Sequence, residues 1–388
     1  MASAAALPAR PIPGDDHVSD SSAALNLLQV DTETRWGGGQ QQVQHLCQGL
    51  VAGGHRVTLV CHRDGILRHR MKQAPVTVLT LPSFGEVDPR GILGLARIIS
   101  RGRFDLMHMH SSRAHTMGAL AAALVRFRPR VVSRRSRHST RRDPINRWKY
   151  GSGIDRVVAI SRAVRRSLLE SGFDPEDVDL VPSGIDPPRR RDGARKAVIA
   201  EFGLPADAEL AVCVANLVAL KGHRTLIRAV ALLAGRRPAL RVILAGGGPL
   251  LGDLEGAARS AGVKKHILFC GFRNDIDRLL SAADLSVCPS LSEGLGLSIL
   301  DALAMELPVA ASDVGGIPEI ISHEETGLLV PPGDPAALAE AMERLLDDRD
   351  TATRLGRAGR KVVLEKYSVE AMVQGTEAVY RRVLNQAG

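Results

Sequence analysis

An acidic loop in the second half of the chain carries the side chains best suited to chemistry. An apolar run ends at Pro289 and is followed by the loop Glu293-Gly294-Leu295-Gly296-Leu297. The second acid, Asp301, lies eight residues after Glu293. We expect a strand to end near Pro289 and a helix to begin near Leu297. Each carboxylate can accept hydrogen bonds from two neighbouring hydroxyls of a sugar or ribose, while the free amides of the helix start favour a phosphate. In the alternative interpretation the two acids have no ligand: one caps a helix and the other is an ordinary surface charge.

A lysine at another strand end offers a positive charge for a phosphate. Lys221 follows an apolar run and precedes Gly222 and a helical pattern of apolar residues. An ammonium group at such a turn can act as a point charge for a diphosphate, although a single lysine can equally be an ordinary surface residue. Asn216 lies five residues before it. Gly247 follows the next expected strand, where glycine permits close packing against a nucleotide or against another part of the domain.

Three glycines, Gly37, Gly38 and Gly39, follow the first expected strand and open a helical pattern. Because glycine has no side chain, the backbone there can approach a ligand closely, and the amides of a helix start favour a phosphate. A tight bend without a ligand is the alternative interpretation. The turn becomes informative only together with the other candidate residues.

Two histidines stand two residues apart on an expected strand. Since successive side chains of a strand point to opposite faces, His108 and His110 share a face, and His110 lies at the carboxyl end. His110 is therefore positioned to reach a crevice at that end of a sheet, or else it is a structural histidine. Two histidines without a third ligand do not indicate zinc. The sequence predicts no protein-bound metal and no cofactor.

The candidate residues lie where apolar, β-branched runs end, and these runs alternate with helical patterns. Such alternation is typical of parallel strands covered by helices on both faces, and it predicts an α/β fold of two doubly wound, Rossmann-like domains facing across a cleft. Ligands of such sheets bind at the carboxyl ends of the strands. The expected strands are Leu25–Val30, Val57–Cys61, Val76–Leu81, Leu106–His110, Val131–Ser133, Val157–Ile160, Val178–Pro182, Ala211–Leu217, Val242–Ala245, Ile267–Cys270, Leu285–Pro289, Val309–Ser312 and Gly327–Val330.

Proline, glycine and charge divide the chain into domains. Residues 187–193 can neither continue a helix nor pair in a central strand, so we interpret them as a linker. The linker separates an N-terminal domain at 23–186 from a C-terminal domain at 194–366, and an amphipathic stretch at 367–388 predicts a last helix. Residues 1–22 are rich in Ala, Pro and Ser and are expected to form a disordered tail rather than a signal peptide.

The positive charge of the chain is concentrated in one segment. The 388 residues carry a net charge of +9, and between Arg126 and Tyr150 nine arginines and one lysine stand against one aspartate. We expect an anionic partner there, such as a phosphorylated glycolipid or another saccharide, the headgroups of a membrane or nucleic acid. A solvated basic loop is the alternative, and no nucleic-acid module accompanies the charge. The candidate acceptor-binding side chains are Arg134, Arg135, Arg137, Arg141 and Arg142.

Cysteine usage and hydropathy favour the cytoplasm. The five cysteines are odd in number and lack Cys-x-x-Cys spacing, so neither a disulfide framework nor a zinc cluster is indicated. No run of about 18 apolar residues could span a bilayer. The sequence therefore predicts a cytoplasmic protein whose only membrane contact is peripheral, at the inner face of the cytoplasmic membrane.

Taken together, these segments resemble a large family of retaining glycosyltransferases with the GT-B fold of two Rossmann-like domains. The resemblance is to glycosyltransferase family 4 (group 1), which includes many bacterial lipopolysaccharide and envelope sugar transferases, and it runs from about Leu25 to Leu384. Glu293 to Asp301 looks like the family's pair of acids separated by seven residues, although the second acid is usually glutamate. Lys221 resembles its donor-phosphate lysine, while Asn216 stands where arginine is frequent.

The resemblance implies transfer of a hexose-type sugar from a nucleotide-sugar donor to a glycolipid or other envelope acceptor, with retained configuration and without a metal. Glu293 would then bind the hydroxyls of the transferred sugar, Asp301 the ribose, and His110 the sugar beside the reacting carbon. The donor diphosphate would meet Lys221 and the two glycine-rich turns, and the helix at 367–388 would pack back on the N-terminal domain. The alternatives are a non-catalytic sugar-nucleotide-binding protein, hinted at by Asn216 and Asp301, and a phosphorylase or epimerase on the same fold. The nucleotide base, the sugar and the oligomeric state have no signature in the sequence.

Overall fold

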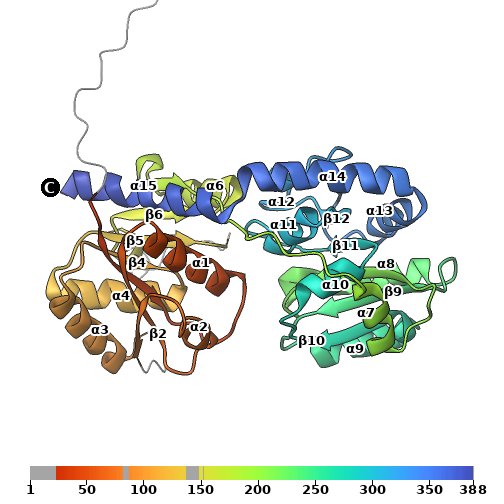
Figure 1. The fold of residues 1–388 in the computed structure, drawn as a ribbon, viewed down its shortest axis with the longest axis horizontal. Helices are drawn as coiled ribbons and strands as arrows, with labels where there is room; N and C mark the ends of the chain where they lie inside the picture. Colours follow the sequence, from red (N-terminus) through yellow and green to blue (C-terminus); the bar gives the residue numbers. More distant parts are fainter. Residues whose placement is uncertain (1–22, 82–86, 137–147, 152, 388) are drawn as a thin grey trace, which may run out of the picture.

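Two parallel β-sheets covered by helices form the molecule (Figure 1). The computed structural model describes residues 23–81, 87–136, 148–151 and 153–387. The first sheet has seven strands in the order β3-β2-β1-β4-β5-β6-β7, and the second has six in the order β10-β9-β8-β11-β12-β13. The strands are β1 (Asn26–Asp31), β2 (Arg56–His62), β3 (Thr77–Leu81), β4 (Leu106–Met109), β5 (Arg130–Arg134), β6 (Arg156–Ala159), β7 (Val178–Leu180), β8 (Glu209–Val214), β9 (Leu240–Ala245), β10 (Ile267–Gly271), β11 (Leu285–Cys288), β12 (Val309–Ser312) and β13 (Leu328–Val330).

The helices follow the strands in the alternation that the sequence predicts. They are α1 (Gly38–Ala52), α2 (Ile66–Arg70), α3 (Pro89–Gly102), α4 (Ser112–Val125), α6 (Arg162–Glu170), α7 (Ala194–Phe202), α8 (His223–Leu233), α9 (Leu251–Ser260), α10 (Ile276–Ala282), α11 (Leu297–Ala304), α12 (Ile317–Ile320), α13 (Pro335–Asp347), α14 (Arg349–Lys366) and α15 (Val369–Ala387). Polar side chains cap several of them. Ser111 and Ser161, for example, accept hydrogen bonds from the first turns of α4 and α6.

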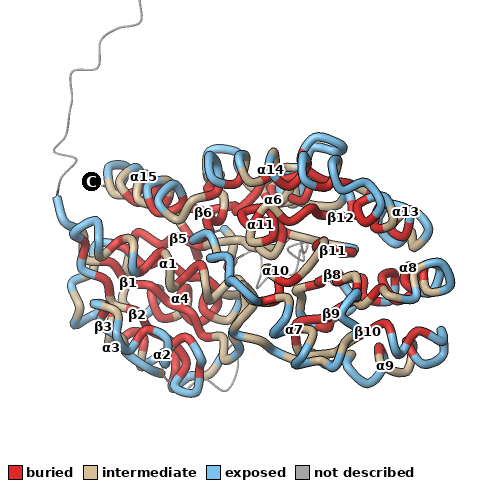
Figure 2. Tube along the Cα trace, turned by 45° about the vertical axis from the view of Figure 1, so that its right-hand side comes forward, coloured by how far each residue is buried: buried red, intermediate tan, exposed pale blue. Residues whose placement is uncertain are grey.

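Each sheet is buried on both faces, which explains the nearly continuous apolar runs of its strands. In β1, Leu27 packs with α1 and α15 on one face of the sheet, whereas Leu28 packs with α3 and α4 on the other. Figure 2 shows buried residues along the strands and exposed residues along the outer sides of the helices. The predicted α/β fold with two doubly wound sheets is confirmed.

The strand order reverses once in each sheet. The reversal lies between β1 and β4 in the first sheet and between β8 and β11 in the second. All pairs in both sheets are parallel, so the loops that follow these four strands leave the same edge of their sheet. In doubly wound folds this is where ligands bind. The glycines after β1, the lysine after β8 and the acidic loop after β11 therefore start from the two reversal points.

The chain crosses between the two halves twice, and the crossings lie side by side. The segment around Ile185 runs parallel to the segment around Ser368, and the Ile185 amide donates to the Tyr367 carbonyl at 2.8 Å. The side-chain amide of Gln42 donates to the Gly184 carbonyl oxygen and accepts from the Gly184 amide, which ties the first crossing to α1. Figure 1 shows α14 lying over the second half of the molecule and α15 continuing over the first.

The last helix packs closely on the first one. Gly49 of α1 lies so near Val373 of α15 that a Cβ atom added to the glycine would stand 2.4 Å from a valine methyl carbon. Further along α15, the hydroxyl of the fully buried Tyr380 bonds to the side chains of Gln29 on β1 and His108 on β4. The carboxyl-terminal helix is thus part of the core of the N-terminal half.

Candidate functional site

The candidate residues meet in one cavity of about 330 Å³ between the two halves. Loops from both reversal points line it, together with the starts of α1 and α11. Amides at two helix starts thus open onto the same space, which favours an anionic ligand. Of the residues predicted to bind a donor, the cavity is lined by Gly37, Gly38, Gly39, Asn216, Lys221, Leu295, Gly296, Leu297 and Asp301, with the predicted catalytic residue Glu293 beside them.

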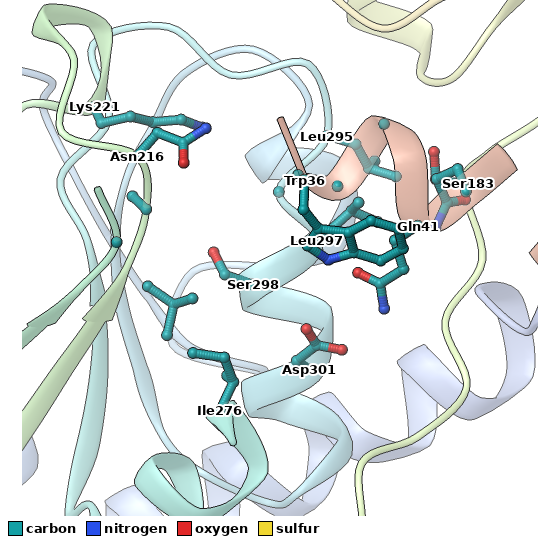
Figure 3. A pocket seen from close by; sticks show the side chains of 18 of the residues that line it. Trp36, Gln41, Ser183, Asn216, Lys221, Ile276, Leu295, Leu297, Ser298 and Asp301 are labelled. Atoms are coloured by element: carbon teal, nitrogen blue, oxygen red, sulfur yellow. The ribbon is translucent and has the colours of Figure 1, made fainter. Parts of the chain in front are cut away.

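Lys221 and Glu293 form an ion pair on one wall of this cavity. The ammonium nitrogen lies 2.5 Å from a carboxylate oxygen, which also accepts a hydrogen bond of 3.1 Å from Ser290. Burial alone would lower the pKa of Lys221, but the ion pair with Glu293 outweighs it and holds that pKa above its ordinary value. Lys221 is therefore charged at neutral pH, and Figure 3 shows it beside Asn216 on the same wall.

Asp301 projects from α11 into the cavity (Figure 3). Among the described residues, no side chain or backbone group forms a hydrogen bond or ion pair with its carboxyl group. Burial raises the pKa of Asp301 from 3.8 to about 7. The group is thus balanced between its neutral and charged forms near physiological pH, and it has both oxygens free for a ligand.

The two halves touch at the mouth of the cavity through glycines. A Cβ atom added to Gly38 would lie 2.5 Å from the Leu297 side chain of the opposite half, and one added to Gly294 would lie 2.1 Å from the Arg135 carbonyl oxygen. Both values are shorter than contacts that carbon atoms can make. Glycine is required at position 294, where backbone opposes it, whereas at position 38 an added methyl group would displace the end of the Leu297 side chain.

Arg135, predicted to bind an acceptor, lines the cavity on the N-terminal side opposite Lys221. Its side chain lies beside Gly39: a Cβ atom added to this glycine would stand 3.6 Å from Cδ of Arg135. Burial lowers the pKa of Arg135 to about 10, an effect that nearby Asp31 partly offsets, so the guanidinium stays charged at neutral pH. Within the described part of the chain, no carboxylate forms an ion pair with it.

His110 does not line the cavity, because Arg135 stands between its ring and the open space. The structure places the His110 ring 4.0 Å from that of His108, so the two histidines share a face as predicted. One ring nitrogen lies 2.7 Å from the Gln29 side chain and the other lies 3.3 Å from Arg135. Burial, helped by the charge of Arg135, holds the pKa of His110 well below its ordinary value.

The remaining predicted site residues lie elsewhere. Gly246 lines the cavity while its neighbour Gly247 does not, and Gly294 contacts the opposite half at the mouth. Arg134 turns away and donates to the Tyr150 hydroxyl at 2.8 Å. Three candidate acceptor-binding residues lie outside the described residues, namely Arg137, Arg141 and Arg142.

Sequence reasoning missed several groups of the site. Asp31 does not line the cavity itself, but it ends β1 beside the glycine turn that does; it accepts hydrogen bonds from the Glu33 amide and the Gln40 side chain, and burial raises its pKa to about 6. An acid as the last residue of a buried strand, just before the glycine turn, was the available signal. Phe272, half exposed, and Arg273 also line the cavity, and no spacing rule singles them out.

Two features of the described residues bear on metal binding and on membrane contact. No group of three or more histidine, cysteine, aspartate or glutamate side chains in that part of the chain is arranged to hold a metal ion. Nor does any helix within the described ranges combine the length and the apolar character that crossing a bilayer requires.

Comparison with known proteins identifies the family. The family profile described as "Glycosyl transferases group 1" matches residues 194–362, and "Glycosyltransferase Family 4" matches residues 36–189. The putative glycosyltransferase EpsD of Bacillus subtilis is 30% identical over 297 residues, which cover 72% of this chain and 77% of the relative. The chain belongs to the group 1 glycosyltransferases. The predicted membership is thereby confirmed.

Other relatives of this glycosyltransferase bear more specific names. A GDP-mannose-dependent alpha-(1-6)-phosphatidylinositol monomannoside mannosyltransferase of Mycobacterium tuberculosis is 33% identical over 230 residues, which span 56% of this chain and 60% of that protein. The crystal structure of Anabaena HepE, in complex with UDP and glucose, superposes with a TM-score of 0.83 at 21% identity and covers 92% of this chain and 99% of that one. The latter match confirms the GT-B fold.

Proposed function

We propose that this glycosyltransferase moves a hexose-type sugar from a nucleotide-sugar donor to an anionic glycolipid acceptor, with retention of configuration and without a protein-bound metal. The observation that carries the proposal is the meeting of Lys221, Glu293 and the Gly37–Gly39 turn in one cavity between the halves. These residues come from opposite domains and distant parts of the sequence. Only a ligand that spans both halves, with an anionic and a hydroxyl-rich part, uses all of them.

The donor diphosphate is proposed to lie between Lys221 and the two helix starts. The ammonium group keeps free N–H donors beside Glu293, and the amides at the starts of α1 and α11 add partial positive charge. Both kinds of group stabilise the charge that develops on the departing diphosphate. The UDP in the complex of Anabaena HepE supports a nucleotide donor for this chain as well.

The two carboxylates are proposed to hold the donor's hydroxyl groups. Glu293 lies beside Lys221 and would accept from the transferred sugar, while Asp301, farther along α11, would accept from the ribose. Asp301 is one methylene shorter than the glutamate usual in the family, so the ribose would have to lie closer to α11 to make the same contact. Because Asn216 stands where the family often has arginine, Lys221 is proposed to be the principal cation of the C-terminal wall.

The acceptor is proposed to be an anionic, membrane-associated glycolipid. Arg135 of the basic segment lines the cavity, and the exposed side of α3 carries Arg90, Arg97 and Arg101 without an acid on that helix. The glycolipid substrate named for the Mycobacterium tuberculosis relative is consistent with this choice. The place of action would be the inner face of the cytoplasmic membrane, in keeping with five free cysteines among the described residues.

The donor is tested by thermal-shift screening of UDP-, GDP- and ADP-sugars, since a ligand at about 100 times its dissociation constant adds about 2.7 kcal/mol of stability. Acceptor-dependent release of free nucleotide then separates transfer from binding alone, and NMR of the product's anomeric proton reports retention. Lys221→Met serves as the matched negative control. Release of nucleotide that no acceptor accelerates would contradict the proposed transfer.

Membrane contact is tested separately by flotation with liposomes of anionic lipid. Binding should weaken steeply as salt rises, because the interaction is between exposed arginines and headgroups. An Arg97→Glu/Arg101→Glu variant, altered only on the exposed side of α3, should float less. Flotation that is equal for neutral and anionic liposomes would contradict the charge-based contact.

A further inference from the structure

A chain of buried hydrogen bonds connects the cavity to the last helix. Arg135 lies 3.3 Å from Nδ1 of His110, whose Nε2 lies 2.7 Å from the Gln29 side-chain oxygen. The Gln29 amide nitrogen lies 3.1 Å from the Tyr380 hydroxyl on α15. From there the chain continues to Nδ1 of His108 at 2.6 Å. Side chains from both ends of the sequence thus form one connected network.

The direction of every bond in this chain follows from Arg135. A guanidinium can only donate, so Nδ1 of His110 must accept, and the ring proton must therefore sit on Nε2. Nε2 then donates to the Gln29 oxygen, and the Gln29 amide donates to the Tyr380 hydroxyl. That hydroxyl in turn donates to His108, whose other nitrogen donates to a serine hydroxyl at 2.9 Å. Each group in the chain is satisfied in only this arrangement.

His110 has no free nitrogen to offer a substrate in this arrangement. Both ring nitrogens are engaged, and the ring is buried behind Arg135. Its low pKa, caused by burial and by neighbouring positive charge, keeps it neutral. A neutral ring with its one proton on Nε2 can hold Arg135 and Gln29, and it then has no nitrogen left to hydrogen-bond a ligand in the cavity.

Arg135, in contrast, has donors to spare. Only one of its terminal nitrogens bonds to His110; within the described part of the chain the other terminal nitrogen has no partner, and neither has the Nε, which is buried. The side chain lines the cavity opposite Lys221, whose charge is already paired with Glu293. A charged fork of this kind suits two oxygens of a phosphate or carboxylate.

We propose that Arg135, rather than His110, is the side chain of the N-terminal domain that binds the anionic groups of the substrates, and that His110, Gln29 and Tyr380 are positioning residues that hold its guanidinium toward the cavity. The identity of the anion as a diphosphate rests on the proposed function. The hydrogen-bond chain itself does not. Through Tyr380, the carboxyl-terminal helix takes part in substrate binding without reaching the cavity.

A double-mutant cycle tests the positioning role, with inorganic pyrophosphate as the probe in isothermal titration calorimetry. Arg135→Gln should weaken pyrophosphate binding about 10- to 100-fold, the loss expected for one charged hydrogen-bonded contact. Tyr380→Phe keeps the buried ring but removes the hydroxyl, and it should weaken binding severalfold in the wild-type background. In the Arg135→Gln background, Tyr380→Phe should have no further effect.

Tyr367→Phe is the matched control. Tyr367 is also buried near the end of the chain, and its hydroxyl donates to the Glu319 carbonyl at 2.8 Å, outside the network. This variant should bind pyrophosphate like the wild type. Losses that add in the double variant, or unchanged binding by Arg135→Gln, would overturn the proposal, as would a wild-type protein that does not bind pyrophosphate at all.

NMR of protein labelled with ¹⁵N-histidine tests the bond directions without a ligand. The signals of His110, assigned by their loss in His110→Gln, should show a neutral ring protonated on Nε2 from about pH 5.5 to pH 8. A proton on Nδ1 or a titration in this range would overturn the chain as described. If no sugar nucleotide is turned over, the proposed function fails, yet both the pyrophosphate cycle and this spectrum still decide the role of Arg135.

Discussion

Replacing Asp301 with asparagine should stabilise the folded protein at high pH and at the same time weaken donor binding. The carboxyl group has its pKa raised from 3.8 to about 7 by burial, and none of the described residues supplies a partner. The folded state therefore binds a proton more tightly than the unfolded state. Because stability falls with pH wherever the folded state holds more protons, Asp301 destabilises the fold progressively between these two values and most strongly above about pH 7.

The size of the effect follows from the shift. Each pH unit between the two pKa values corresponds to about 1.4 kcal/mol, so the shift from 3.8 to about 7 gives an upper limit of about 4 kcal/mol. Asparagine has nearly the same shape but no charge. The stability difference between Asp301→Asn and the wild type should thus grow by about 2 kcal/mol from about pH 5 to about pH 7, and level off above about pH 8.

Urea unfolding of both proteins at half-unit steps of pH measures this difference directly. Asp313→Asn is the matched control, because Asp313 is an exposed acid of the same domain. The pH dependence of the stability difference should be larger for Asp301→Asn than for this control. A flat profile for Asp301→Asn would refute the reasoning, since the carboxyl group would then titrate as if it were in water.

The same substitution separates stability from function. Ribose hydroxyls would give the Asp301 carboxylate the partners that it lacks, so the nucleoside diphosphate of the donor found in the thermal-shift screen should bind more tightly as the pH rises toward about 7. Asp301→Asn should bind this nucleotide more weakly at about pH 8 and show a smaller dependence on pH. A gain in stability coupled to a loss of affinity is the pattern expected of a group kept for binding.

Three further variants test the cavity and the contact between the halves. Lys221→Met should weaken pyrophosphate binding about 10- to 100-fold in calorimetry, because it removes the ammonium group from the C-terminal wall. Gly38→Ala should lower kcat/KM, since its methyl group would lie 2.5 Å from the Leu297 side chain, and a second change, Leu297→Ala, should restore much of the loss. Glu319→Ala removes two hydrogen bonds of 2.8 Å to the Arg162 and Ala163 amides at the start of α6, so kcat/KM should fall about 10-fold in steady-state assays.

The fold was accessible from the sequence because parallel strands buried on both faces leave a strong pattern. Short apolar runs such as Val57–Cys61 and Val309–Ser312 coincide with β2 and β12 to within one residue at each end. The helix start at Leu297 was predictable for the same reason, since the glycines before it break the pattern of the preceding strand. Local composition thus determined most elements and their order.

The depth of individual side chains was not accessible in this way. His110 was expected in the crevice because it follows β4, and its face of the sheet was predicted correctly. Arg135, however, follows the neighbouring strand β5, and its guanidinium lies 3.3 Å from Nδ1 of His110. The basic segment gives no sign of which arginine turns inward, and Gln29 meets Tyr380 across 351 residues of sequence. Such relations depend on the order of strands in the sheet, which no spacing in the sequence reveals.

Arg135 also connects substrate binding to the contact between the halves. Its carbonyl oxygen lies against Gly294 at the mouth of the cavity, and its side chain faces the interior, so one residue belongs to both the contact and the site. If the halves moved apart, the contact between Arg135 and Gly294 would be lost, and the Arg135 guanidinium would move away from the C-terminal wall of the cavity. We infer that the cation of the N-terminal half reaches a ligand held on Lys221 only when Gly294 is in place. A bulkier residue at position 294 should therefore reduce the contribution of Arg135 to pyrophosphate binding, so that Gly294→Ala and Arg135→Gln give losses that do not add.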